Sequence, residues 1–255
     1  MVPYNLGWEM ELKYIVSAVL GVSGGLIALK GFLGANQSYI NLGIAGLFLS
    51  AVLLILKSSK YVKKDAVDVM LSSYKGFLKN LLSNLKLEGK AVYIPPYENL
   101  PKGGVFVPLY EEFDLDPARL DEDTFFLTDV PSERSMGVLI TSLGTDLLEK
   151  YEEHLEAPIT SVPEVESSAD SVLKALGLAK RVYIEENDEN IRVIVSPEVS
   201  CSPEECEKVQ CPICASILLG LAKATDNLIG VESFEKKDYG VEIKAKKLGG
   251  VREWM

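Results

Sequence analysis

The chain has 255 residues, a single His, four Cys and a formal net charge of −11. Residues 1–64 hold six Lys and two Glu, so residues 65–255 carry 20 Lys and Arg against 35 Asp and Glu, a net charge of −15. A body this acidic repels phosphate backbones and argues against nucleic acid as a partner. The single His excludes His-based metal clusters and most Ser–His–Asp arrangements.

Two apolar segments open the chain, over residues 14–33 and 39–56, and a short polar turn joins them. At 1.5 Å rise per residue they would be about 30 Å and about 27 Å long, which suffices for the hydrocarbon core of a bilayer. A backbone in lipid must satisfy its own hydrogen bonds, so we predict a transmembrane helical hairpin. A cleaved signal peptide fits poorly because a second apolar segment follows, and a soluble core hairpin would show a polar face.

Small residues recur along both apolar segments. Ser17, Gly21 and Gly25 are spaced by four in the first, and Gly46 and Ser50 in the second. Small side chains let membrane helices approach closely. We predict that this stripe is an interface, either within the hairpin or in self-association or contact with another protein through the membrane helices.

Basic residues flank the hairpin on the side of its two ends. The positive-inside rule therefore predicts a cell-membrane protein with two spans, both termini in the cytoplasm, and the lipid bilayer as its partner. The basic run after the second segment would also attract anionic headgroups. The residues concerned are Lys13, Lys57, Lys60, Lys63 and Lys64.

The remaining chain alternates helical and strand patterns. An amphipathic helix is expected over residues 65–87, and residues 111–123 read as an acidic, solvated loop. Residues 136–155 read as a strand followed by a helix, or as one helix. Further helices are expected at residues 169–178 and 212–227. Strands are expected at residues 91–94, 105–109, 125–128, 181–184, 191–195, 228–234 and 241–245.

This order predicts an α+β fold, with the transmembrane hairpin followed by one or two small cytoplasmic α+β units of short antiparallel strands. Residues 157–168, rich in Pro and Ser, read as a linker between the two units. The expected parts are the hairpin and basic stretch at 1–64, a first unit at 65–156, the linker, a second unit at 169–248 and a frayed tail at 249–255.

All four thiols lie within one short segment, at Cys201, Cys206, Cys211 and Cys214. Cytoplasmic thiols stay reduced, so a disulfide framework is not expected. Four thiols that include a C-x2-C pair suit a tetrahedral Zn2+ site, and less well an iron–sulfur cluster. The neighbouring Glu204, Glu205 and Glu207 would favour a bound cation. The pattern therefore predicts a structural metal site made by the four cysteines.

A redox reading of the same segment stays open. Pro212 suits the first position of a helix, which would place Cys211 at the N-cap and Cys214 one turn further on. A helix N-terminus stabilises a thiolate, so these two residues could serve a thiol redox or metal-dependent enzyme. The structural alternative is that Cys214 is a small core residue and the other three are loop thiols.

The order of features resembles a family of uncharacterised archaeal membrane proteins. These have two N-terminal helices, a segment similar to residues 93–96 (Tyr-Ile-Pro-Pro) with residues 105–108 (Val-Phe-Val-Pro), and a Cys-Pro-x-Cys helix like residues 211–215. The resemblance implies no activity. We therefore expect a non-enzymatic, membrane-anchored cytoplasmic module for binding, scaffolding or sensing, with a membrane-tethered thiol enzyme as the alternative.

Overall fold

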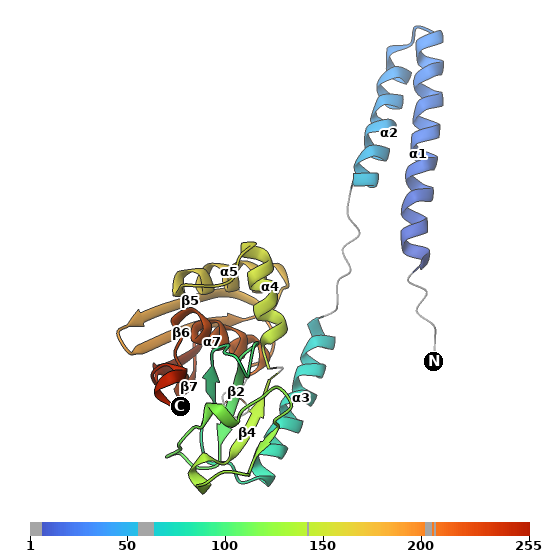
Figure 1. Ribbon diagram of the computed structural model, residues 1–255. Helices are drawn as coiled ribbons and strands as arrows, with labels where there is room; N and C mark the ends of the chain where they lie inside the picture. The colour runs from blue at the N-terminus through green and yellow to red at the C-terminus, as the bar shows by residue number, and fades with distance from the viewer. Residues whose placement is uncertain (1–6, 56–63, 142, 202–205, 207) are drawn as a thin grey trace. The chain divides into compact units, whose positions relative to one another are not determined.

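The computed structural model describes residues 7–55, 64–141, 143–201, 206 and 208–255 (Figure 1). The chain divides into two compact units, residues 1–62 and 63–255. The first holds a pair of helices and the second an α+β domain, so the predicted fold class is confirmed.

The first unit is a helical hairpin of α1 (Gly7–Leu33) and α2 (Gln37–Ile55). Both helices are long and apolar enough to cross a membrane. Two serines join them through reciprocal hydrogen bonds. The Ser17 hydroxyl donates to the Ser50 carbonyl at 2.9 Å, and the Ser50 hydroxyl donates to the Ser17 carbonyl at 2.8 Å. The predicted contact of small residues therefore lies within the hairpin.

Glycines set the close approach of α1 and α2, but not all of those expected. A side chain at Gly43 would collide with the backbone of Ala28, and one at Gly24 would lie 2.9 Å from the backbone nitrogen of Leu47. Gly25 has open space around it, so it does not belong to the contact. The reason is the helical period: the buried positions of α1 follow steps of three and four residues, and not of four alone.

One eight-stranded antiparallel sheet forms the centre of the second unit, in the order β3-β4-β2-β1-β7-β8-β6-β5. The strands are β1 (Val92–Ile94), β2 (Gly104–Pro108), β3 (Phe126–Leu127), β4 (Gly137–Ile140), β5 (Ala179–Asn187), β6 (Asn190–Pro197), β7 (Ile229–Lys237) and β8 (Gly240–Lys247). β1 pairs with β7 through Val92↔Gly230 and Tyr93↔Ile229. The sheet thus joins both of the α+β units expected from the sequence.

Helices contribute to the larger of two hydrophobic cores. They are α3 (Lys64–Asn84), α4 (Thr145–Leu155), α5 (Val162–Ala175) and α7 (Pro212–Thr225). α7 is the central one, with residues 213–222 all buried. Alternate strand residues such as Phe106 and Leu139 point to the smaller core instead. That second core is closed by loops and by the C-terminal residues.

Three expectations are corrected. The expected linker at residues 157–168 is partly helical, because α5 begins at Val162 after a capping box made by Ser161 and Glu164. The acidic segment 111–123 buries Leu115 and Leu120 in the smaller core. The tail is ordered: residues 251–253 form a 3-10 helix, and the Trp254 ring stacks on Phe113 at 5.7 Å.

Candidate metal centre

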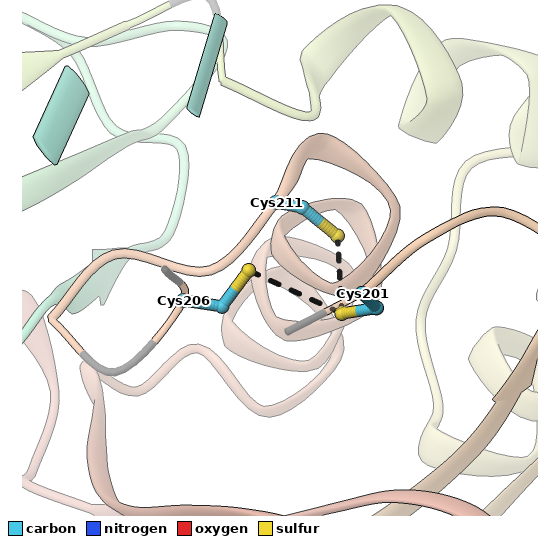
Figure 2. Close-up of side chains that lie close together, drawn as sticks. All are labelled: Cys201, Cys206 and Cys211. Atoms are coloured by element: carbon cyan, nitrogen blue, oxygen red, sulfur yellow. Dashed lines mark hydrogen bonds between the residues drawn. The ribbon is translucent and has the colours of Figure 1, made fainter. Parts of the chain in front are cut away.

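Three of the four cysteines come together at the start of α7 (Figure 2). The Cys201 sulfur lies 4.0 Å from that of Cys206 and 3.9 Å from that of Cys211. All three side chains are buried, with exposed fractions of 9%, 0% and 3%, and none forms a disulfide. Thiols that are buried together away from water have few partners for their polar atoms. A cation bound by all of them would supply such a partner.

The spacing of the three sulfurs fits a single metal ion. Zinc binds thiolate sulfur at about 2.3 Å, so two sulfurs at tetrahedral corners stand about 3.8 Å apart. The observed separations of 3.9 and 4.0 Å are close to that value, and all three sulfurs lie within 4.8 Å of one another. The three cysteines are therefore close enough to hold one metal ion.

Cys214 stands apart from this group. Cys211 is the N-cap of α7, Pro212 is its first residue, and Cys214 lies in its first turn and is buried. This local arrangement is the one that the sequence predicts. The Cys214 sulfur does not lie within the 4.8 Å group, although its thiol interacts with the thiols of Cys201 and Cys211.

The four thiols differ in acidity because of how they face one another. The pKa of Cys211 lies well below its ordinary value, because the thiols of Cys201, Cys206 and Cys214 all stabilise its anionic form. The pKa of Cys206 is raised, because its thiol interacts with the Cys201 and Cys211 sulfurs and is buried. Among the four thiols, Cys211 is thus the one whose anionic form its neighbours stabilise.

Two buried polar side chains hold the cysteine segment against the sheet. The Tyr93 hydroxyl on β1 donates to the Gln210 side-chain oxygen at 2.7 Å, and the Gln210 amide donates to the Cys206 carbonyl at 3.1 Å. Gln210 has no exposed surface. Burial raises the pKa of Tyr93, so its hydroxyl keeps the proton that it donates. Cys206 is therefore positioned from β1 through one glutamine.

A second set of contacts connects the cysteine segment to α3. The buried Lys75 donates from Nζ to the Ser200 carbonyl at 2.5 Å, and the Ser200 N–H donates to Asp68 Oδ1 at 2.7 Å. These bonds fix the residue immediately before Cys201. They also place the Lys75 ammonium group on the backbone carbonyl of the residue before Cys201.

Sequence reasoning missed Tyr93, Gln210, Lys75 and Asp68 as parts of this site. Only Gln210 lies near the thiols in the sequence, and no spacing marks the other three. The three glutamates at positions 204, 205 and 207 lie outside the described residues. His154, the only histidine, is exposed in the last turn of α4.

The fold and the thiol group define an α+β protein with a candidate thiolate metal centre, preceded by two long apolar helices. The chain belongs to the family described as Domain of unknown function (DUF7982), whose profile matches residues 12–244. Comparison with the curated proteins and with the solved structures finds no match.

Proposed function

We propose that this protein is a membrane-anchored cytoplasmic binding, scaffold or sensor module, whose α+β domain is stabilised by one Zn2+ bound to Cys201, Cys206, Cys211 and Cys214. The observation that carries the proposal is the group of three buried sulfurs, 3.9 and 4.0 Å apart. An iron–sulfur cluster places several atoms between its ligands and would hold the sulfurs farther apart.

Cys214 completes the tetrahedron in this proposal. It is buried one helical turn after Cys211. Four thiolates around Zn2+ carry a net charge of −2, which needs compensation in a buried site. The Lys75 ammonium beside Ser200 supplies part of it.

A structural role is favoured over a catalytic one by burial. Catalytic zinc keeps an open position for water or substrate, whereas structural zinc is closed by four protein ligands. The second candidate function, a thiol redox enzyme using Cys211 and Cys214, is supported by the lowered pKa of Cys211 at a helix N-terminus. Its weakness is that the same thiols are shielded from solvent.

The membrane part of the proposal rests on the apolar hairpin and on the distribution of charge. The two spans have mean hydropathies of 1.8 and 2.0. Lysines flank the hairpin at its two ends, so both termini would face the cytoplasm and the turn at residues 34–36 would face outward. The resemblance to a family of archaeal membrane proteins also supports this part of the proposal.

Metal analysis of anaerobically purified protein tests the site. We expect about one equivalent of zinc per chain, with loss of zinc and of cooperative unfolding in Cys201→Ser, Cys206→Ser and Cys211→Ser variants. Cys214→Ser should weaken zinc binding and leave the three-sulfur group in place. Metal-free protein with a titratable Cys211–Cys214 dithiol would favour the redox enzyme instead.

Labelling of introduced cysteines tests the orientation, because the four natural thiols are buried. Ser38 is exposed in the first turn of α2, next to the turn of the hairpin, and Ser171 is exposed on α5. A membrane-impermeant maleimide should label Ser38→Cys in intact cells and Ser171→Cys only after permeabilisation. The reverse pattern would contradict the proposed orientation, and extraction of the protein by alkaline carbonate would contradict membrane insertion.

A further inference from the structure

α3 carries apolar side chains on two faces, although it packs on the α+β domain with only one. Its inner face contributes Leu78 and Leu82 to the larger core. On its outer side Val69, Met70 and Phe77 are 67%, 72% and 65% exposed. Met70 and Phe77 are seven positions apart, which places them above one another on the helix, with Val69 beside them. We call these three residues the α3 strip.

The polar side chain that lies among the members of the α3 strip already has a hydrogen-bond partner within the helix. Ser73 lies between its members, and the Ser73 hydroxyl donates to the Val69 carbonyl within the helix at 3.0 Å. Gly76 is exposed next to Phe77 and adds no polar side chain. The nearest exposed cation on the helix, Lys79, is two positions after Phe77 and so lies about 200° around the axis. Two exposed polar residues also lie on this side of α3, Asp65 four positions before Val69 and Asn80 three positions after Phe77. The strip is thus a set of three exposed apolar side chains over about two helical turns, with polar neighbours at both ends.

We propose that the α3 strip docks on the lipid surface, with Val69, Met70 and Phe77 at the boundary between headgroups and acyl chains. The inference rests on the membrane anchoring proposed above. Helices with one polar face and one apolar face bind in this zone of the bilayer. The inner face of α3 packs on the α+β domain, so the outer strip would make the contact with lipid.

The short connection between α2 and α3 favours lipid as the partner of the α3 strip. The second apolar helix ends at Ile55 and α3 begins at Lys64. The eight residues between them make nine Cα–Cα steps, which reach at most about 32 Å when fully extended. With the hairpin in a bilayer, the start of α3 would therefore lie within about 32 Å of the end of α2, and the connecting sequence contains Lys57, Lys60 and Lys63, which would complement anionic headgroups.

The small area of the α3 strip argues against a second protein as its partner. Val69 and Phe77 are eight positions apart, so the α3 strip is about 12 Å long. A stable protein–protein interface buries about 800 Å² on each partner, far more than three side chains provide. Partial insertion of three side chains is sufficient when the two membrane helices already hold the protein at the surface.

Docking of α3 would give the cysteine segment a fixed place. Asp68 and Lys75 bond to Ser200, next to Cys201. The helix that contacts lipid would therefore be the helix that braces the metal centre, so the centre would lie close to the bilayer.

Fluorescence quenching in liposomes tests the proposal on the full chain. Trp8 and Trp254 are first replaced by Phe, and a single Trp is introduced as Phe77→Trp, with Met70→Trp as a second probe of the same face. Lys79→Trp is the matched control on the far side of α3. Lipids brominated near the headgroup should quench the Phe77→Trp variant at least about twice as strongly as the control, with emission at shorter wavelength.

Equal quenching of the two faces would overturn the proposal. Emission at shorter wavelength without quenching by the brominated lipid would also overturn it, because the α3 strip would then be covered by protein. Alkaline carbonate is applied to the same liposomes. Release of the chain would refute the membrane anchor itself, whereas a chain that resists carbonate but shows no quenching refutes only the docking of α3.

Discussion

The Tyr93 hydroxyl donates a 2.7 Å hydrogen bond to the Gln210 side-chain oxygen, and this bond joins β1 to the cysteine segment across 117 positions of sequence. Both side chains are completely buried. The bond therefore has no water to replace it, and Gln210 in turn holds the Cys206 carbonyl.

Tyr93→Phe should destabilise the protein by about 1–3 kcal/mol, because it leaves the Gln210 oxygen buried without a donor. It should also lower zinc affinity by about tenfold or more, as expected when the support of a metal ligand is lost. Chemical denaturation in detergent and competition with a zinc chelator measure the two effects. Tyr183→Phe is the matched control, since Tyr183 occupies an exposed position on β5. Equal effects of the two substitutions would contradict this role of Tyr93.

Glu242 on β8 should make the stability of the folded protein depend on pH. It accepts hydrogen bonds from Arg192 at 2.8 Å and from the Tyr239 hydroxyl at 2.6 Å, and these contacts lower its pKa from 4.5 to about 2. A lowered carboxyl pKa stabilises the folded state above pH 4.5, and this contribution is lost as the pH falls from 4.5 towards 2. Glu242→Gln should be less stable than the wild type at pH 6, and the difference should shrink at pH 2.5. Thermal unfolding at both pH values measures it, and a constant difference would refute the assignment.

Two carboxylates of α5 cover the free edge of the sheet. The Val182 N–H donates to Asp170 Oδ1 at 2.8 Å, and the Ile184 N–H donates to Glu166 Oε2 at 3.2 Å, on the edge strand β5. A double Asp170→Ala, Glu166→Ala variant should lose about 1 kcal/mol per bond and self-associate through β5. Light scattering against protein concentration checks this. The Asp170→Asn, Glu166→Gln variant keeps two acceptors and should remain unassociated like the wild type. Self-association of both variants would therefore show that the loss of charge, and not the exposed edge of β5, is the cause.

Gly43 and Gly25 provide a test of the helical hairpin. A side chain at Gly43 would collide with Ala28, whereas Gly25 has open space around it. In a chain that also carries Ser17→Cys and Ser50→Cys, disulfide formation in membranes reports whether α1 and α2 remain in contact. Gly43→Leu should reduce its yield strongly, and Gly25→Leu should leave it unchanged. Loss of the disulfide in both variants would show that the packing differs from the one described.

Much of this fold could be predicted because local patterns determine it. The amphipathic period of α3 and the alternation in β5 and β6 indicate helix and strands directly. Residues 136–155 left two alternatives open, and the structure has β4 followed by α4. The linker was misjudged although a signal was present, since Ser161 and Glu164 have the spacing of a capping box.

The rest depends on contacts that no local pattern contains. The pairing of β1 with β7, which makes one sheet of the two expected units, joins distant segments. The sequence pattern predicts that the four thiols form one site, and three of them, Cys201, Cys206 and Cys211, form the tight group, while Cys214 lies outside it in the first turn of α7. The Tyr93–Gln210 bond, through which Gln210 positions the Cys206 carbonyl, has no sequence signature.

The position of the β7–β8 hairpin between β1 and β6 has a consequence for biosynthesis. These two strands are translated last, yet they occupy the middle of the sheet. A nascent chain in which this hairpin has not yet been made would therefore have two open strand edges, at β1 and β6, until the hairpin arrives. The β7–β8 hairpin therefore closes both open edges at once, and the sheet is complete only when it has paired with β1 and β6.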